Sequence, residues 1–255
     1  MTVASAVYGA RKRRNQNPLS IFAGLSVIWI DALGGVHLRD NAAGSISDGE
    51  AIEYAYDRGP GSRNAVGQGL QTRPTYAAAA FGGRGAMHFH HSSFYRLLGN
   101  TTHPTVTGNN PHCVIAVGQM VSGSSNTGWA AIGWDQVGYY TSCVGVYSAK
   151  YWSGGAGDAS ANSLSAGSSD NSPHVLAKTY DGTNVRRYID GTLDGTYAPG
   201  SSYVVQPGYE IGSWYYNAVS GSPLYIGEVV IVTGGSVSGA QITAFTNYAK
   251  NRWGF

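Results

Sequence analysis

The stretch LYIGEVVIVT (residues 224–233), followed by the C-terminal SGAQITAFTNYAKNRWGF (238–255), decides the fold of this chain. Its centre holds four consecutive apolar β-branched residues, at positions 229–232. Such a run favours a strand that is buried on both faces, and the two glycines that follow Thr233 end it. We therefore expect a central strand that is covered on both sides by other parts of the protein.

The C-terminal segment predicts the one helix that the sequence pattern supports convincingly. Ser238 and Gln241 have the S-x-x-Q spacing of a capping box, which indicates a helix start. Apolar residues then recur at spacings of three and four, which gives the predicted helix one apolar side. These residues are Ile242, Phe245, Ala249 and Trp253.

The remainder of the chain has the composition of a β-sandwich. Its 255 residues suffice for one large all-β domain with a substantial core. With 37 Gly, 18 Tyr and only 12% charged residues, the composition is typical of tight turns between half-buried strands. The segment HVLAKTYDGTNVRRYID (174–190) predicts a β-hairpin, because Asp181 and Gly182 form a favourable turn pair.

Further short apolar segments separated by Gly and Ser predict more strands of such a sandwich. Three of them are CVIAVGQMV (113–121), GWAAIGW (128–134) and SCVGVYSAKYW (142–152). We interpret each as a single strand. The small polar residues of 154–173 predict one long loop.

The net charge of +2 is unevenly placed along the chain. Four basic residues form one run near the N-terminus: Arg11, Lys12, Arg13 and Arg14. The rest of the chain has 12 Lys and Arg against 14 Asp and Glu, so it offers no basic face for a specific nucleic acid. We expect residues 1–20 to form a flexible basic arm and residues 21–255 to form the folded domain. The arm is either a solvated tail or an anchor that orders on a partner.

Two cysteines, Cys113 and Cys143, are too few for a disulfide framework. Both lie in strand-like runs, so we favour two buried free thiols over a single disulfide. The sequence shows neither a secretion signal nor an apolar segment long enough to cross a bilayer. A composition typical of exported surface proteins, without an export signal, favours a virion surface; an extracellular location is the alternative.

Several segments, taken in order, carry a resemblance to a known family. They are VIWIDA (27–32), TRPTY (72–76), GGRGAMHF (82–89), PHCVIAVGQM (111–120), HVLAKTYDGTNVRRYIDGTLDGT (174–196), YIGEVVIV (225–232) and TNYAKNRWGF (246–255). Together they resemble the laminin-G-like branch of the concanavalin A-like lectin/glucanase superfamily, in its bacterial and phage form. The resemblance implies a two-sheet antiparallel jelly-roll sandwich over about residues 25–255. It implies little about function, because this fold hosts lectins, hydrolases, lyases and scaffolding proteins.

The acidic residues do not form the pattern of a glycoside hydrolase. Such enzymes need two carboxylates about 5–10 Å apart, and the glucanases of this superfamily carry them in a Glu-x-Asp-x-x-Glu strand. This chain has no such run. Its glutamates are Glu50, Glu53, Glu210 and Glu228, and Glu228 has no acidic residue at 226 or 230. We therefore expect no catalytic residues, and a polysaccharide lyase or glycoside hydrolase on this fold is the alternative.

Aromatic residues at or near the ends of predicted strands are the candidate ligand-binding residues, because a flat ring with a polar tip suits an exposed binding surface. They are Trp134, Trp152, Trp214, Tyr215 and Tyr216, with Trp129 in the same class. Side chains alternate along a strand, so the three consecutive rings at 214–216 cannot all face the core if that segment is extended. Core filling is the competing interpretation, and we expect it for Trp29 and Trp253.

Two groups of residues raise the question of a metal. His88, His90 and His91 form an H-x-H-H cluster, in which 88 and 90 point to the same side of a strand, as metal ligands would. No third ligand can be placed from the sequence, so we interpret them as histidines without a metal. Calcium is the other option, because laminin-G-like domains often bind it, and its candidates are the loop residues Asp135, Asp158 and Asp170. Our prediction is no cofactor and no metal.

These observations lead to one functional hypothesis and two competitors. We hypothesise a non-catalytic structural protein of a virion surface, such as a phage decoration, fibre or tail-associated protein, that contacts a glycan or host surface. Its partners would be other virion proteins through Arg11–Arg14, a cell-surface glycan, and further copies of the chain in a homo-oligomer such as a trimer. The competitors are a polysaccharide-degrading enzyme and a secreted carbohydrate-binding module.

Overall fold

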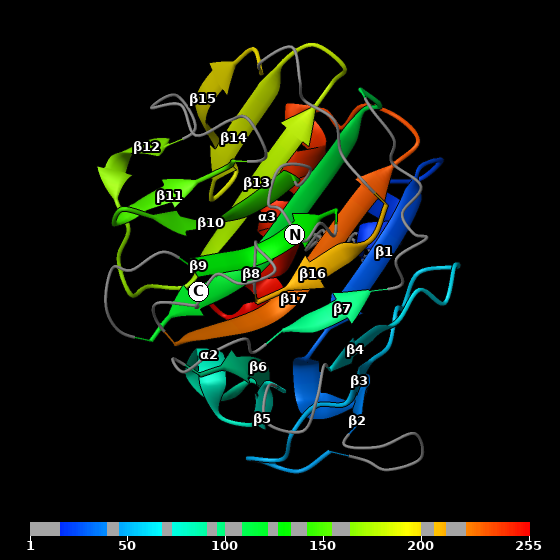
Figure 1. The fold of residues 1–255 in the computed structure, drawn as a ribbon, viewed down its shortest axis with the longest axis vertical. Coiled ribbons are helices and arrows are strands. Elements are labelled where there is room, and N and C mark those ends of the chain that lie inside the picture. Colours follow the sequence, from blue (N-terminus) through cyan, green and yellow to red (C-terminus); the bar gives the residue numbers. More distant parts are fainter. Residues whose placement is uncertain are drawn as a thin grey trace, which may run out of the picture.

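The computed structural model describes residues 16–39, 46–67, 73–90, 96–99, 109–121, 127–133, 142–154, 164–199, 207–212 and 223–255. Within these residues the chain forms two β-sheets, in which every strand pairing is antiparallel, and one 15-residue helix near the C-terminus (Figure 1). The predicted all-β fold with a single short C-terminal helix is therefore confirmed. No helix in these residues is long and apolar enough to span a membrane.

Sheet A contains the central strand that the sequence predicts. Its described strands, in spatial order, are β15 (Thr192–Tyr197), β14 (Val185–Ile189), β13 (His174–Tyr180), β8 (His112–Met120), β17 (Leu224–Thr233), β6 (Ala86–Phe89) and β5 (Thr75–Ala77). A further strand, β1 (Ser26–Asp31), pairs with β17 from Ser26 opposite Thr233 to Asp31 opposite Glu228. The predicted hairpin is present as β13 and β14, with Tyr180 opposite Val185.

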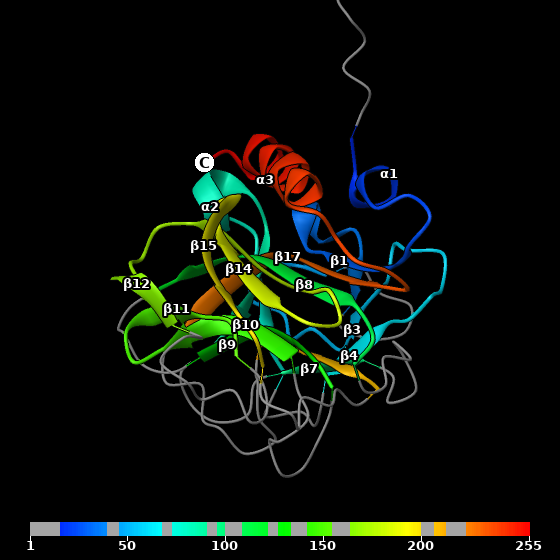
Figure 2. The ribbon, with the colours of Figure 1, turned by 90° about the horizontal axis from the view of Figure 1, so that it is seen from above.

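Sheet B lies against one face of sheet A. Its described strands, in spatial order, are β12 (Leu164–Ser168), β11 (Lys150–Trp152), β10 (Ser142–Tyr147), β9 (Thr127–Ile132), β16 (Tyr209–Ile211), β7 (Leu97–Gly99), β4 (Ala65–Gly67), β3 (Tyr54–Ala55) and β2 (Leu38–Arg39). In Figure 2 sheet A is the middle layer, with α3 (Gly239–Trp253) on one face and sheet B on the other. The short helices α1 (Pro18–Ile21) and α2 (Ala80–Gly83) lie on the same side as α3.

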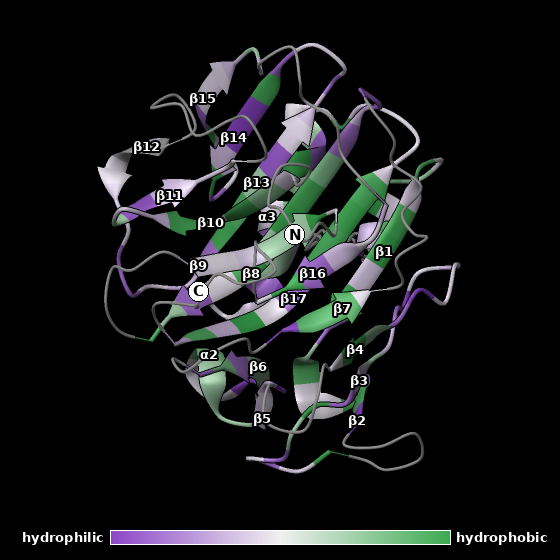
Figure 3. Cartoon of the chain, in the orientation of Figure 1, coloured by the Kyte–Doolittle hydropathy of each residue, from purple (hydrophilic) through white to green (hydrophobic). Residues whose placement is uncertain are grey.

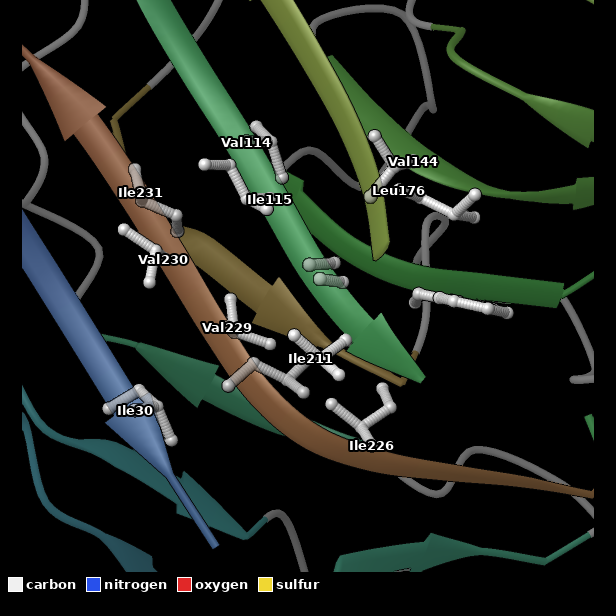
Figure 4. Packing of buried hydrophobic residues seen from close by; sticks show 14 of the residues in the cluster. Ile30, Val114, Ile115, Val144, Leu176, Ile211, Ile226, Val229, Val230 and Ile231 are labelled. Carbon is white, nitrogen blue, oxygen red and sulfur yellow. The ribbon is translucent and has the colours of Figure 1, made fainter. Parts of the chain in front are cut away.

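The alternation of side chains along β17 explains why sheet A is covered on both faces. Val229 and Ile231 point towards sheet B, where they meet residues such as Ile211 (Figure 4). Glu228 and Val230 point the opposite way, towards α3. A strand in the middle of three layers needs apolar residues in both directions. Figure 3 shows hydrophobic colour along much of β17.

The C-terminal helix forms as its sequence predicts. The Ser238 hydroxyl accepts a hydrogen bond from the Gln241 backbone, and the Gln241 side chain accepts one from the Ser238 backbone. Gly254 ends α3 in the left-handed conformation, with φ of 80°, which favours glycine. The predicted apolar side is fully buried against sheet A: Ile242, Phe245, Ala249 and Trp253 are each 0% exposed.

Two details of the predicted organisation are wrong. The segment 142–152 is two strands, β10 and β11, because Ser148 and Ala149 both adopt positive φ and reverse the chain. The predicted loop 154–173 contains strand β12. Most of the predicted arm, residues 1–15, lies outside the described residues; at its end Asn17 caps α1, and Gln241 of α3 donates a hydrogen bond to the Ile21 carbonyl.

The two cysteines are buried and free, as predicted. Cys113 lies on sheet A opposite Val232, on the face towards α3, and burial raises the pKa of its thiol. Cys143 belongs to a small cluster on sheet B. The two thiols therefore lie in different layers of the protein.

Candidate functional site

The outer face of sheet B, turned away from sheet A, is the candidate binding surface. The corresponding face of sheet A is covered by α3, whereas none of the described helices lies on the outer face of sheet B. Three residues of sheet B form a hydrophobic cluster on this face, separate from the core between the sheets: Ala131, Cys143 and Trp152. We call these three residues the outer cluster. Cross-strand pairing holds it together, since Ala131 lies opposite Cys143.

Tyr147 is the exposed ring of this surface. It lies at the end of β10, is 37% exposed, and its ring centroid is 5.9 Å from that of Trp152. Trp152 itself is only 6% exposed, and Gly154 packs so closely on its indole that a Cβ there would lie 1.7 Å from the ring. Trp152, a predicted ligand-binding residue, is therefore mostly buried and supports the Tyr147 ring. Tyr147 is not among the predicted residues, because the sequence pattern does not mark the turn at Ser148 and Ala149 that follows it.

An ion pair lies beside the outer cluster. Glu210 on β16 pairs with Ala131 on one side and Leu98 on the other, and its Oε1 is 3.8 Å from Nη1 of Arg96. Glu210 is 2% exposed and Arg96 is 9% exposed. A buried charge of this kind is tolerated when an opposite charge accompanies it. We therefore assign this pair to the architecture of the sheet rather than to direct ligand contact.

Most of the residues predicted to act in binding lie outside the described residues. They are Trp134, Trp214, Tyr215, Tyr216 and the basic run Arg11, Lys12, Arg13 and Arg14. The strands that lead to the aromatic residues are described, however. β9 and β16 are antiparallel neighbours, with Gly133 N bonded to Gly208 O at one end and Gly212 N bonded to Trp129 O at the other. The segments with Trp134 and with Trp214 therefore leave the centre of sheet B at opposite ends.

Glu228 is a fully buried carboxylate that accepts three side-chain hydrogen bonds. Its Oε1 accepts hydrogen bonds from Trp29 Nε1 at 2.6 Å and from the Tyr248 hydroxyl at 3.0 Å, and its Oε2 accepts one from Trp253 Nε1 at 2.8 Å. Two of these donors lie on α3 and one lies on β1. Glu228 therefore ties the helix to two strands of sheet A. Trp29 and Trp253 fill the core, as predicted, but each also uses its N–H here.

Asp31 completes a buried pair of carboxylates that the sequence analysis did not find. It lies directly opposite Glu228 in the β1–β17 ladder and forms ion pairs with Arg58 and Arg252. Burial, and then the charge of Asp31, raise the pKa of Glu228 to about 7. The pair is 1% and 0% exposed, so a substrate does not reach it. Only the strand register reveals this pair, because its members are far apart in sequence.

Glu50 and Glu53 also have bonding partners. Glu50 accepts a hydrogen bond from the backbone N–H of Ser47, at 2.5 Å, and Glu53 pairs with Arg73 at 3.2 Å. Neither contact involves a second carboxylate.

His174 forms a node between the two sheets and α3. Its Nδ1 lies 2.8 Å from Asp190 and its Nε2 lies 2.9 Å from Asp170, and the Tyr151 ring packs on it at 4.9 Å. Lys250 of α3 approaches Asp190 at 3.9 Å. Burial lowers the pKa of His174, but the hydrogen bonds to Asp190 and Asp170 outweigh burial, so the pKa lies above 6.5. Asp170 is therefore paired with a histidine, and the two other calcium candidates, Asp135 and Asp158, lie outside the described residues.

The His174 node predicts a pH-dependent contribution to stability. Because the pKa of His174 is raised in the fold, its contribution is present below pH 6.5 and is lost as the pH rises through the raised value. The pKa values of Asp170 and Asp190 are lowered, so their contributions are present above about 3.8 and are lost as the pH falls. We expect His174→Gln to cost about 1–2 kcal/mol of unfolding free energy at pH 5.5 and much less at pH 8.5. Urea unfolding at both pH values measures this, and an equal loss at both would contradict it.

His88 of β6 and His90, the first residue after that strand, lie close together. Their ring centroids are 3.9 Å apart, and the Tyr225 ring lies 4.7 Å from His88. Burial, and then the neighbouring His90, lower the pKa of His88 to about 4, and burial also lowers the pKa of His90. His91 lies outside the described residues. Among the described residues no group of three or more His, Cys, Asp or Glu side chains is arranged to hold a metal ion.

Comparisons with known proteins support the fold. No protein-family model matches the chain, and no curated protein matches its sequence. Among solved structures, the sialidase of Trypanosoma rangeli is similar over 91% of this chain, with a TM-score of 0.57 and 13% identity. The binding domain of Paraclostridial Mosquitocidal Protein 1 is similar over 88%, with a TM-score of 0.57 and 8% identity. The binding domain of botulinum neurotoxin serotype G is similar over 75%, with a TM-score of 0.53 and 8% identity.

These similarities concern only part of each neighbour. The chain spans 33% of the sialidase chain, 53% of the mosquitocidal protein domain and 48% of the neurotoxin domain. At these identities the similarity establishes a shared β-sandwich fold.

Proposed function

We propose that this chain is a non-catalytic β-sandwich that binds glycans at the outer face of sheet B and at the loops that leave it. The proposal rests on a difference between the outer faces of the two sheets. Sheet A has α3 on its outer face, whereas sheet B presents Tyr147 there, supported by Trp152. Its two central strands also lead directly into the segments that contain Trp134 and the run 214–216.

The known neighbours support a role in glycan recognition by analogy. One is a sialidase, which has also been solved in complex with sialic acid, and two are binding domains of toxins. We infer from the sequence resemblance and the shared sandwich that the chain is a concanavalin A-like, laminin-G-like jelly roll. A virion-surface location, anchoring through Arg11–Arg14 and assembly as a trimer are further parts of the proposal, and they rest on the sequence.

The carboxylates of the described chain support a non-catalytic role. Glu228 and Asp31 are buried and bonded to aromatic N–H groups and to arginines, and Glu210 is buried beside Arg96. A general acid must reach the glycosidic oxygen, which none of these groups does in its present place. The competing function is polysaccharide degradation, which the sialidase neighbour favours by name alone.

Glycan binding is tested with a glycan array that includes sialylated, neutral and bacterial surface glycans. We expect binding, and we expect Tyr147→Ala and Tyr215→Ala each to weaken it about tenfold, or about 1.4 kcal/mol. Leu193→Ala is the matched control, because Leu193 is 51% exposed but lies on β15 at the edge of sheet A. The absence of any bound glycan would overturn the proposal. Release of products from a polysaccharide would establish the enzyme instead.

A further inference from the structure

A single row of paired residues crosses the outer face of sheet B. Strand register joins each member to the next, and in order they are Arg39, Tyr54, Val66, Leu98, Glu210, Ala131 and Cys143. The middle of the row is buried, because Leu98, Glu210 and Ala131 are at most 8% exposed. The β2–β3 end is partly exposed, and it lies at the opposite end of the sheet from Tyr147 (Figure 1).

Two tyrosines and an arginine form the partly exposed end of this row. Leu38 and Ala55 are 0% exposed and belong to the core between the sheets. Alternation therefore points their neighbours Arg39 and Tyr54 outward. Tyr56 lies on the same side, since its ring stacks on that of Tyr54, with centroids 6.2 Å apart and planes 22° from parallel. Cζ of Arg39 lies 5.7 Å from the centroid of the Tyr56 ring, and we call these three residues the tyrosine–arginine patch.

The polar groups of the patch are open to a ligand. Nη1 of Arg39 donates to the carbonyl oxygens of Val36 and Leu38, at 2.7 and 2.6 Å, which holds the guanidinium in place. Within the described part of the chain, Nε and Nη2 of Arg39 and the hydroxyls of Tyr54 and Tyr56 have no hydrogen-bond partner. These groups can therefore bond to a ligand without breaking a contact of the fold.

Arg39 also differs from most described arginines in its charge partners. Seven others each lie within 4.0 Å of a carboxylate: Arg58, Arg63, Arg73, Arg96, Arg186, Arg187 and Arg252. No described carboxylate forms such a pair with Arg39. A partly exposed guanidinium without an acidic partner is suited to an anionic ligand, because its planar fork matches a carboxylate or a similar oxyanion.

We propose that the tyrosine–arginine patch is a subsite for an acidic sugar, that is, a glycan unit that carries a carboxylate or sulfate group. The inference rests on the glycan-binding function proposed above and names the class of glycan. The sugar packs its apolar face on the tyrosine rings, and Nε and Nη2 of Arg39 donate charge-assisted hydrogen bonds to the acidic group. The tyrosine hydroxyls bond to hydroxyls of the sugar.

The charge of sheet B supports an anionic ligand. Among the described strand residues of this sheet, Glu210 is the only acidic one, and Arg96 beside it offsets its charge. The basic strand residues Arg39 and Lys150 lie near opposite ends of the sheet. Lys150 is the cross-strand partner of Tyr147, so each end combines an aromatic ring with a positive charge.

The test is an array of carboxylated, sulfated and neutral glycans, followed by calorimetric titration of the full chain with the acidic glycan that binds best. We expect acidic glycans to bind more tightly than neutral ones, and the arm that binds identifies the acidic group. Arg39→Ala and Tyr56→Ala should each weaken the binding about tenfold. Added salt should weaken binding to the wild type more than to Arg39→Ala, because the variant lacks one charged contact.

Arg84→Ala is the matched control. Arg84 forms no ion pair among the described residues either, but its Nη1 lies 3.5 Å from the carbonyl oxygen of Asn251 on α3, away from sheet B. The substitution should leave the affinity for acidic glycans unchanged. Thermal unfolding should show that Arg39→Ala and Tyr56→Ala are folded, and Tyr56→Ala decides if Arg39→Ala is not.

The outcomes separate this inference from the proposed function. Binding of neutral glycans alone, or equal affinity of the wild type and both patch variants for acidic glycans, would overturn the acidic subsite and leave glycan binding intact. The absence of any bound glycan would overturn both. Binding of an oligonucleotide that depends on Arg39, without binding of any acidic glycan, would also contradict the subsite.

Discussion

Glu228→Ala is expected to lower the free energy of unfolding by about 3–5 kcal/mol, one of the two largest losses that the structure predicts. The substitution leaves the N–H groups of Trp29 and Trp253 and the Tyr248 hydroxyl without their acceptor under α3. It also removes a carboxylate within 4.0 Å of Arg252 Nε. Urea unfolding followed by tryptophan fluorescence measures the loss, because two of the affected donors are tryptophans.

Glu53→Ala is the matched control for this prediction. Glu53 also pairs with an arginine, Arg73, but its side chain is 26% exposed, so the loss should be at most about 1 kcal/mol. Equal losses for the two glutamates would show that the Glu228 contacts do not anchor α3.

The pH dependence of the free energy of unfolding provides a second test of the Glu228 contacts. Its pKa rises from 4.5 to about 7 in the fold, so its contribution to stability is present below pH 4.5 and is lost as the pH rises through 7. In Glu228→Gln, the free energy of unfolding should no longer show the part of its decline between pH 5 and pH 8 that Glu228 causes. A variant whose stability declines as steeply as that of the wild type would contradict the raised pKa.

Trp129→Ala is expected to cost about 3–5 kcal/mol, the other large loss. Trp129 is 0% exposed and crosses the space between the sheets, from β9 to Gly118 on β8. Removing the indole leaves a cavity between two sheets that strand pairing holds in place. Urea unfolding measures the loss, and Tyr147→Ala on the outer face is the control, with an expected loss of less than about 1 kcal/mol.

Gly118 makes the Trp129 prediction more specific. A Cβ at this position would lie 2.7 Å from the Trp129 ring, so Gly118→Ala alone should cost about 1–3 kcal/mol. In the Trp129→Ala background the added methyl group enters the space that the ring has left, so Gly118→Ala should cost much less there. A double-mutant cycle measures this coupling. Strictly additive losses would mean that the two residues do not pack against each other.

Local sequence patterns were sufficient to predict much of the fold. The β-branched run at 229–232, the Ser238–Gln241 capping box and the Asp181–Gly182 turn each depend on residues that are neighbours in the chain. The buried side of α3 follows from helical periodicity alone. The turn at Ser148 and Ala149 was missed because neither residue is one that typically favours positive φ.

The candidate surface was harder to predict, because strand pairing decides which side a residue faces. Trp129 and Trp152 were both predicted among the surface aromatics. The pairing of β9 with β10 shifts its register between Val144 and Gly145, and Trp129 turns into the core at this irregularity. Trp152 is buried because Gly154 lets the chain pack closely over its ring.

Signals between near neighbours in the chain were sufficient to predict the central apolar strand, the capped helix, the hairpin turn and the two buried cysteines. The folded arrangement set which distant residues meet. It placed Asp31 opposite Glu228, brought Asp170 and Asp190 to His174, and left Tyr147 exposed above Trp152. The physical reason is that propensity and periodicity act between near neighbours in the chain. Register and layer packing join residues whose separation in sequence carries no information about their distance in space.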